Sequence, residues 1–138
     1  AFQRNHVAKL LSKICSFKKV SKLKYYNDLK ISKIVISPFG YGEINLRDFE
    51  AFLNACILFK PNMDHLETWP NLYIKNKTYI DFNWNLNDLI LKLENVLAEY
   101  NKYNEVGING FRLYNRILDS KDMDIKFCER FKKLLMYN

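Results

Sequence analysis

Two short apolar segments joined by an amphipathic one constrain the fold of this chain more than any other feature. Residues 34–36 (Ile-Val-Ile) and 56–59 (Cys-Ile-Leu-Phe) are apolar throughout, without the polar alternation of a half-exposed strand. Such runs are typical of parallel sheets, which are covered by helices on both faces. Residues 46–54 between them carry helical periodicity, as a crossover between parallel strands requires. We therefore expect a β–α–β unit at the centre of an α/β fold.

Helical and strand-like patterns continue on both sides of this unit. In residues 2–15 the apolar side chains recur at helical spacing, at Val7, Leu10, Leu11 and Ile14. The other predicted elements are a strand at 17–20, a helix at 21–29 capped by Ser21 with Leu23, Tyr26 and Leu29 inward, a short strand at 78–82, a helix capped by Asn85 or Asn87 and reaching Leu97, and helices at 103–118 and 121–135. This alternation predicts a single domain over residues 1–138 with a Rossmann-like, doubly wound parallel sheet and C-terminal helices.

Composition excludes several classes of protein. Hydrophobic residues make up 49% of the chain and charged residues 27%, so it is neither disordered nor of low complexity. No apolar stretch approaches the roughly 18 residues that a membrane-spanning helix needs. Three dispersed cysteines argue against a disulfide framework and favour a reducing, cytoplasmic setting. We expect these cysteines to fill space in the core.

The basic excess is confined to the N-terminal quarter of the chain. The net charge is +7, and residues 1–33 alone hold nine basic residues and one acidic residue. A domain that wraps nucleic acid would more often spread lysine and arginine along a face, so we expect no nucleic acid as a partner. The quarter is either a solvated lysine-rich face or a surface that meets phosphates, an acidic partner or an anionic membrane.

The loop after the first apolar strand carries the clearest chemical signal. Residues 37–43 (Ser-Pro-Phe-Gly-Tyr-Gly-Glu) join a buried strand to a helix, and ligands of open α/β sheets bind at this edge. Gly40 and Gly42 let a ligand approach the backbone closely, and the free N–H groups of the helix start suit a phosphate. Arg47 could add a forked donor, and Glu50 could accept hydrogen bonds from vicinal sugar hydroxyls. These residues predict a nucleotide or nucleotide-sugar pocket.

The same residues also allow simpler interpretations. The dinucleotide fingerprint fails because Asn45 occupies its third glycine position, and no G-K-[ST] motif follows as in a Walker A loop. The two glycines would equally suit an ordinary tight turn. Arg47 and Asp48 would equally suit a surface ion pair or a helix cap, worth at most about 1 kcal/mol.

Three side chains further along the chain have alternative roles. His65 lies beside Asp64 and Glu67, and it could bind a metal with them, line a ligand cleft or stay at the surface. Without a second histidine nearby we expect no metal. Trp69 and Tyr73 could stack on a base or a sugar, or anchor their loop to the domain.

Four short motifs occur in order between residues 37 and 70: SPFGYGE at 37–43, LRDFEAF at 46–52, KP at 60–61 and HLETWP at 65–70. In this order and spacing they resemble the C-terminal domain of bacterial glycosyltransferases. The family is the group-1-like enzymes of the GT-B fold, often found in capsule and lipopolysaccharide gene sets. The close resemblance covers about residues 25–82.

The resemblance implies an enzyme with two Rossmann-like domains, of which the C-terminal one holds an activated sugar donor. In the family the glycine loop lies near the donor diphosphate, Glu50 would bind the ribose, and Glu43 would be the catalytic acidic residue near the sugar. Arg47 would be the positive partner of the phosphates. The predicted donor-binding residues are Gly40, Tyr41, Gly42, Arg47, Glu50 and His65.

Two positions depart from the family pattern. Glu43 and Glu50 stand one position closer together than the paired glutamates of related retaining enzymes, which concerns Glu43 more than Glu50. Ala55 replaces the glycine that usually follows the helix, and it gives slightly less room for the turn.

The expected function is that of a donor domain. It would bind a nucleoside diphosphate sugar for transfer to a glycan or lipid-linked acceptor in cell-surface polysaccharide synthesis, with no metal or other cofactor. We expect the first strand and an N-terminal acceptor domain upstream of Ala1, and without that domain the chain should not transfer sugar. The expected location is the cytoplasm, with peripheral contact to anionic lipid of the inner membrane as a hypothesis. The alternative is a non-catalytic α/β module that binds a protein partner through its basic quarter.

Overall fold

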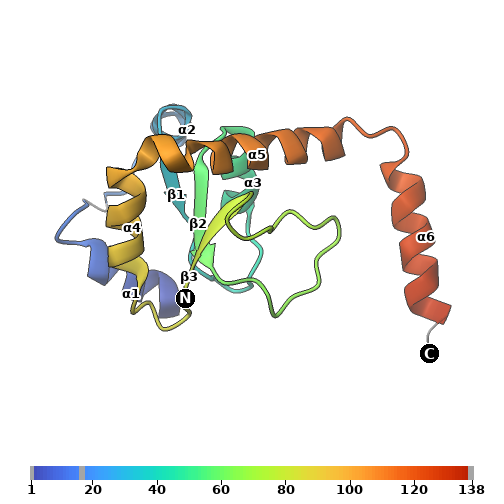
Figure 1. Cartoon of the computed structure of the whole chain (residues 1–138), viewed down its shortest axis with the longest axis horizontal. Helices are drawn as coiled ribbons and strands as arrows, with labels where there is room; N and C mark the ends of the chain where they lie inside the picture. The colour runs from blue at the N-terminus through green and yellow to red at the C-terminus, as the bar shows by residue number, and fades with distance from the viewer. Residues whose placement is uncertain (1, 16–17, 137–138) are drawn as a thin grey trace.

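A three-stranded parallel sheet forms the centre of the molecule (Figure 1). The structure is a computed structural model that describes residues 2–15 and 18–136. In sheet order the strands are β1 (Ile34–Ile36), β2 (Ile57–Pro61) and β3 (Tyr79–Phe82). The two apolar runs of the sequence are thus adjacent parallel strands, and the predicted α/β class is confirmed.

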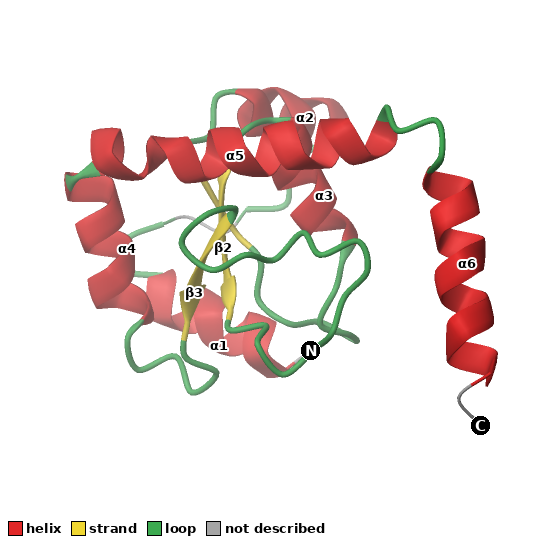
Figure 2. Cartoon of the chain, turned by 45° about the vertical axis from the view of Figure 1, so that its right-hand side comes forward, coloured by secondary structure: helices red, strands yellow, loops and turns green. Residues whose placement is uncertain are grey.

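Helices lie on both faces of this sheet (Figure 2). In chain order they are α1 (Phe2–Leu11), α2 (Lys22–Lys30), α3 (Leu46–Leu53), α4 (Leu89–Ala98), α5 (Tyr100–Leu118) and α6 (Met123–Met136). The connection from β1 to β2 contains α3, as predicted. The connection from β2 to β3, residues 62–78, runs through turns and irregular backbone instead.

The side chains of β2 alternate between two apolar clusters. Ile57 and Phe59 belong to a cluster that includes residues of α1 and α4. Leu58 points the other way, into a cluster that includes Phe52 of α3 and Leu29 of α2. Because both faces of β2 are covered, successive residues all point into an apolar cluster, which is why residues 57–59 lack polar alternation. This layering is compatible with a Rossmann-like fold.

The long helix α5 approaches the sheet closely at a glycine. A Cβ atom built on Gly107 would lie 3.0 Å from backbone atoms of both Cys56 and Ile57, and closer still to the carbonyl oxygen of Ala55. Because these are backbone atoms, they cannot turn away as a side chain could. Gly107 therefore allows α5 to pack against the start of β2.

The N-terminal segment differs from its prediction in two places. Helix α1 ends at Leu11, so Val7 and Leu11 are buried but Ile14 is 54% exposed. The strand predicted at 17–20 is wrong, because residues 18–20 are exposed and irregular; Phe17 itself lies outside the described residues. A strand needs a neighbour to pair its backbone groups, and in the described chain no strand lies beside this segment.

Helix α2 packs on the domain through a different set of side chains from the one predicted. Ser21 caps the helix as expected, accepting a backbone hydrogen bond of 3.3 Å. Leu29 is buried, but Leu23 and Tyr26 are exposed, and Tyr25 packs against the body of the domain instead. This packing brings the Tyr25 hydroxyl to the candidate site described below.

Two element boundaries also differ. Strand β2 continues two residues beyond the apolar run of residues 56–59, through Lys60 and Pro61, where the buried Lys60 ammonium pairs with Asp48. Helix α4 begins at Leu89, after both predicted cap residues. Leu86 adopts a left-handed backbone conformation with a φ of 66°, which does not continue into a helix.

Two cysteines expected in the core are at the surface. Cys15 and Cys128 are exposed, as is Leu97 at the end of α4. Cys56 is buried as predicted, and this burial raises the pKa of its thiol to about 11. A thiol with a raised pKa is a space-filling side chain rather than a nucleophile.

Helix α6 stands apart from the rest of the domain (Figures 1 and 2). It contains no buried residue, although it carries several large apolar side chains. Within residues 2–15 and 18–136 no helix has the length and the apolar character that crossing a membrane requires.

Candidate functional site

The carboxyl ends of the three parallel strands meet at one edge of the sheet, and the predicted site residues follow the first two of them. An open cavity of about 620 Å³ lies beside the loop after β1. Its wall includes four residues predicted to bind the donor: Tyr41, Gly42, Arg47 and Glu50. It also includes Arg4 of α1 and Tyr25 of α2, neither of which was predicted from the sequence to contact a ligand.

Glu50 is held at the wall of this cavity by hydrogen bonds. The Tyr25 hydroxyl donates to Glu50 Oε2 at 2.5 Å, and the Tyr26 hydroxyl donates to Oε1 at 3.5 Å. Burial and the adjacent carboxylate raise the pKa of Tyr25, so its proton stays in place as a donor. The carboxylate is therefore fixed in orientation and retains lone pairs that can accept further hydrogen bonds.

Two guanidinium groups stand at the same cavity. Arg47 is exposed in the first turn of α3. Arg4 reaches from α1, and its Nη2 atom lies 2.6 Å from the position that a Cβ on Gly40 would take. The absence of a side chain at Gly40 thus leaves space for the Arg4 guanidinium. Neither Gly40 nor Gly42 has a positive φ, so the backbone conformation does not require glycine at either position. A pair of arginines suits a diphosphate, which accepts forked hydrogen bonds.

The N-terminus of α3 contributes less than the sequence suggested. Asn45 Oδ1 accepts a hydrogen bond from the backbone N–H of Arg47 at 3.1 Å, and Asp48 Oδ2 accepts one from the Asn45 N–H at 3.2 Å. This reciprocal capping box already uses N–H groups that were expected to face a phosphate. The positive charge of the site therefore comes mainly from its arginines.

Asp48 is a cap, as one interpretation held, but it is also half of a buried ion pair. Lys60 Nζ lies 3.0 Å from Asp48 Oδ2, and both side chains are fully buried. The carboxylate also accepts hydrogen bonds from the hydroxyls of Ser37 at 2.5 Å and Tyr73 at 2.8 Å. Burial lowers the pKa of Lys60, and attraction to Asp48 opposes that shift. The pair joins the end of β1, the start of α3 and the end of β2.

The same ammonium fixes the glycine loop. Lys60 Nζ donates a hydrogen bond to the backbone carbonyl of Glu43, in addition to its contact with Asp48. Tyr73, considered above as a stacking residue, is buried and bound to Asp48, and burial together with that carboxylate raises its pKa. Tyr73 is thus a loop anchor. Trp69 faces Phe127 of α6, with ring centroids 6.1 Å apart.

Glu43 and His65 lie together, outside the lining of the cavity. Glu43 Oε1 is 4.0 Å from His65 Nε2, and both side chains are partly exposed. His65 also contacts two aromatic rings at the carboxyl edge, Trp84 at 4.5 Å and Phe39 at 6.2 Å between centroids. The residues predicted to bind the donor are therefore divided between the cavity wall and an adjacent group formed by Glu43 and His65.

The acidic neighbours of His65 have other partners. Asp64 accepts a hydrogen bond from the Asn62 amide at 2.9 Å, and Glu67 pairs with Arg130 of α6. Within residues 2–15 and 18–136 no group of three or more histidine, cysteine, aspartate or glutamate side chains could hold a metal ion.

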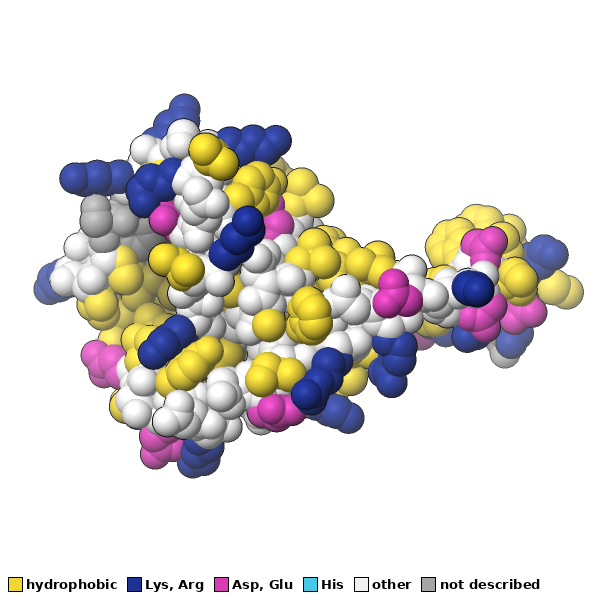
Figure 3. Space-filling model, turned by 90° about the horizontal axis from the view of Figure 1, so that it is seen from above, with side chains coloured by type: hydrophobic (Ala, Val, Ile, Leu, Met, Phe, Trp, Pro, Cys, Tyr) yellow, Lys and Arg dark blue, Asp and Glu magenta, His cyan; other side chains and the backbone are white. Residues whose placement is uncertain are grey.

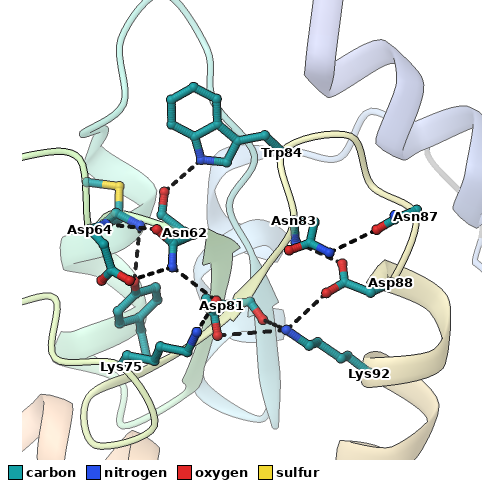
Figure 4. Close-up of polar contacts among 11 residues, drawn as sticks. Asn62, Asp64, Lys75, Asp81, Asn83, Trp84, Asn87, Asp88 and Lys92 are labelled. Carbon is teal, nitrogen blue, oxygen red and sulfur yellow. Dashed lines mark hydrogen bonds and ion pairs between the residues drawn. The ribbon is translucent and has the colours of Figure 1, made fainter.

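A second polar cluster is centred on Asp81 of β3 (Figure 4). Asp81 Oδ2 lies 2.9 Å from Lys75 Nζ and accepts a hydrogen bond from Asn62 at 3.2 Å. Lys92 donates to the Asp81 carbonyl oxygen at 2.9 Å and pairs with Asp88 at 3.0 Å. Because these charges neutralise one another, we interpret the cluster as a structural network that ties β3 to α4.

Sequence reasoning missed Arg4, Tyr25 and the aromatic contacts of Trp84. Arg4 stands among lysine-rich helical residues, and nothing in its local pattern indicates contact with a loop more than thirty positions away. Comparisons with protein-family models, curated proteins and solved structures return no match for the chain. What the site can do is therefore argued from its own residues.

Proposed function

We propose that the chain is the donor-binding domain of a glycosyltransferase, which holds a nucleoside diphosphate sugar for transfer to a glycan or lipid-linked acceptor in cell-surface polysaccharide synthesis. The observation that carries the proposal is the cavity of about 620 Å³ with an oriented carboxylate, Glu50, and two guanidinium groups, Arg4 and Arg47. A carboxylate and two cations match the two parts of such a ligand, a ribose with vicinal hydroxyls and a diphosphate.

Each residue has a distinct role in this proposal. Glu50 accepts hydrogen bonds from the ribose hydroxyls, because Tyr25 holds its carboxylate in one orientation. Arg4 and Arg47 neutralise the diphosphate. Gly42 leaves space for it, since even a Cβ atom added there would meet no atom nearer than 4.0 Å. Glu43 lies beyond the glycines and would face the sugar.

Transfer requires a second substrate site. The family resemblance implies a separate N-terminal domain for the acceptor, because a donor domain alone neither orients two substrates nor excludes water from between them. We therefore expect the chain by itself to bind donor without transferring sugar.

Calorimetric titration with UDP, GDP, CDP and dTDP tests the proposal. One nucleotide should bind, and Glu50→Gln should weaken it about tenfold, the effect of one charged hydrogen bond. Glu94→Gln, which changes an exposed carboxylate on α4, is the matched control and should leave the affinity unchanged. Absence of binding by all four nucleotides, or equal binding by wild type and Glu50→Gln, would contradict the proposal.

A second candidate function is a non-catalytic module that binds a protein partner. The observation that favours it is the surface of α6, where large apolar side chains gather at the far end of the molecule (Figure 3): Phe127, Phe131, Leu134 and Leu135. The exposed lysines of residues 18–33 support contact with an acidic partner or an anionic membrane. A module of this kind would show no nucleotide affinity in the titration above.

A further inference from the structure

Trp84, in the loop after β3, is exposed yet fixed in position. The residue is 52% exposed. Its indole Nε1 donates a hydrogen bond to the Asn62 carbonyl oxygen at 2.8 Å, as Figure 4 shows, and its own carbonyl accepts one from Gln3 Nε2 at 3.3 Å. An exposed indole gains little from burial in the core, so these contacts orient a ring that remains open to solvent.

Two other rings border Trp84. His65 meets it edge-on with centroids 4.5 Å apart and an interplanar angle of 82°, and Phe39 does so at 5.6 Å and 79°. The three residues follow three different strands, so the cluster spans the carboxyl edge of the whole sheet. Glu43 Oε1, 4.0 Å from His65 Nε2, adds a carboxylate to this aromatic corner.

This combination has the chemistry of a sugar site. A pyranose ring has an apolar face of C–H groups, which suits the negative face of an aromatic ring, and a rim of hydroxyls. The Glu43 carboxylate can accept hydrogen bonds from the hydroxyls of such a rim, and the His65 imidazole can accept or donate them. A purely apolar ligand would leave both polar groups unused.

The aromatic corner also lies next to the nucleotide cavity. Arg4 of α1 lines the cavity, while its neighbour Gln3 bonds to Trp84 and accepts a hydrogen bond from the Phe39 N–H at 2.6 Å. The glycine loop separates the two places, with Gly42 in the cavity wall and Glu43 beside His65. A diphosphate that crosses the glycines would therefore carry its sugar to Trp84.

We propose that Trp84, bordered by Phe39 and His65, is the platform on which the sugar ring of the donor stacks, and that it determines sugar affinity rather than nucleotide affinity. The inference rests on the proposed donor-binding function. It assigns the sugar and the nucleotide to separate residues, so the two parts of the ligand can be tested separately.

The experiment measures the affinity of the full chain for a nucleoside diphosphate and for the corresponding nucleoside diphosphate sugars. The sugar should tighten binding, and Trp84→Ala should remove that gain, weakening the sugar nucleotide about fivefold to tenfold while leaving the nucleoside diphosphate unchanged. Trp84→Phe should keep part of the gain. Trp69→Ala, which removes the other tryptophan, is the matched control and should keep all of it. Amide spectra of each variant establish that it is folded.

Three results would overturn the inference. If the nucleoside diphosphate binds but its sugar adds no affinity to the wild type, the platform does not exist. If the affinity gained from the sugar survives in Trp84→Ala, or if this variant binds the nucleoside diphosphate and the sugar nucleotide equally more weakly, Trp84 does not bind the sugar ring, although the nucleotide site is supported. If no nucleoside diphosphate binds, the proposed function fails and this inference fails with it.

Discussion

Lys60 and Asp48 form the contact on which the shape of the glycine loop depends. Both side chains are fully buried, and the ammonium also bonds to the Glu43 backbone. A buried charge without its partner is costly, whereas a buried pair is close to neutral in its effect on stability. The pair therefore specifies one conformation of the loop more than it adds stability.

A substitution of Lys60 should show the free-energy cost of leaving Asp48 buried without its partner. We expect Lys60→Met to lower the free energy of unfolding by about 3–5 kcal/mol, because Asp48 is left buried and unpaired. The double variant Lys60→Met, Asp48→Asn should recover much of the loss. Urea denaturation of the three proteins measures both quantities.

The control for this prediction is an exposed ion pair. Lys102 pairs with Glu99 at 2.9 Å, with the Lys102 side chain 70% exposed. Lys102→Met should change stability by less than about 1 kcal/mol. Equal effects of the two lysine substitutions would contradict the role given to Lys60.

Asp81 makes stability depend on pH. Burial alone would raise the pKa of Asp81, but hydrogen bonds from Lys75 and Asn62 and attraction by Lys92 together lower it below 3.8. A carboxyl group whose pKa is lower in the folded than in the unfolded chain stabilises the folded chain at pH values above its unfolded pKa. This stabilisation is lost as the pH falls through its folded pKa. We expect Asp81→Asn to cost about 2 kcal/mol near pH 7.

The loss caused by Asp81→Asn should begin to shrink as the pH falls below about 4 and should vanish only below the lowered pKa of folded Asp81, where the carboxyl of the folded wild type is protonated as well. Urea denaturation of both proteins over a pH series measures the difference. Asp28→Asn, which breaks an exposed pair with Lys24, is the comparison and should cost little at any pH. A constant difference for Asp81→Asn would show that its charge does not contribute.

Among the secondary-structure elements, those with strong local signals were predictable from sequence. The apolar runs indicated β1 and β2, and Ser21 indicated the start of α2. The strand predicted at 17–20 was wrong, because residues 18–20 are irregular and no strand of the described chain lies beside them to pair with their backbone. Pairing depends on distant residues, which a local pattern does not report.

The close approach of α5 to β2 at Gly107 can be tested by substitution. We expect Gly107→Ala to destabilise the chain by about 1–3 kcal/mol, although alanine favours a helix by about 1 kcal/mol over glycine. The added methyl would meet the backbone of Cys56 and Ile57 at 3.0 Å. Thermal unfolding measures the change. Gly42→Ala, whose methyl would find its nearest neighbour 4.0 Å away, should unfold at the same temperature or slightly higher.

The whole molecule brings its first residues to a loop that follows them by more than thirty positions. Tyr41, Gly42, Arg47 and Glu50 were predictable as a group, because they are close in sequence. Arg4 reaches the same cavity from α1. The aromatic corner likewise joins three loops that are far apart along the chain. Sequence reasoning found the local half of the candidate site and missed the half that depends on tertiary packing.

A map of amide chemical shifts during nucleotide titration would show whether these distant segments bind one ligand. The proposal predicts that the nucleotide that binds shifts signals of Arg4, residues 40–50 and Tyr25 together, and that Glu50→Gln weakens all of these shifts alike. Signals around Lys75 and Lys92 should stay in place, since that network is already neutralised. Shifts confined to α6 or to the lysines of residues 18–33, or no saturable shifts at millimolar nucleotide, would contradict the donor-binding site.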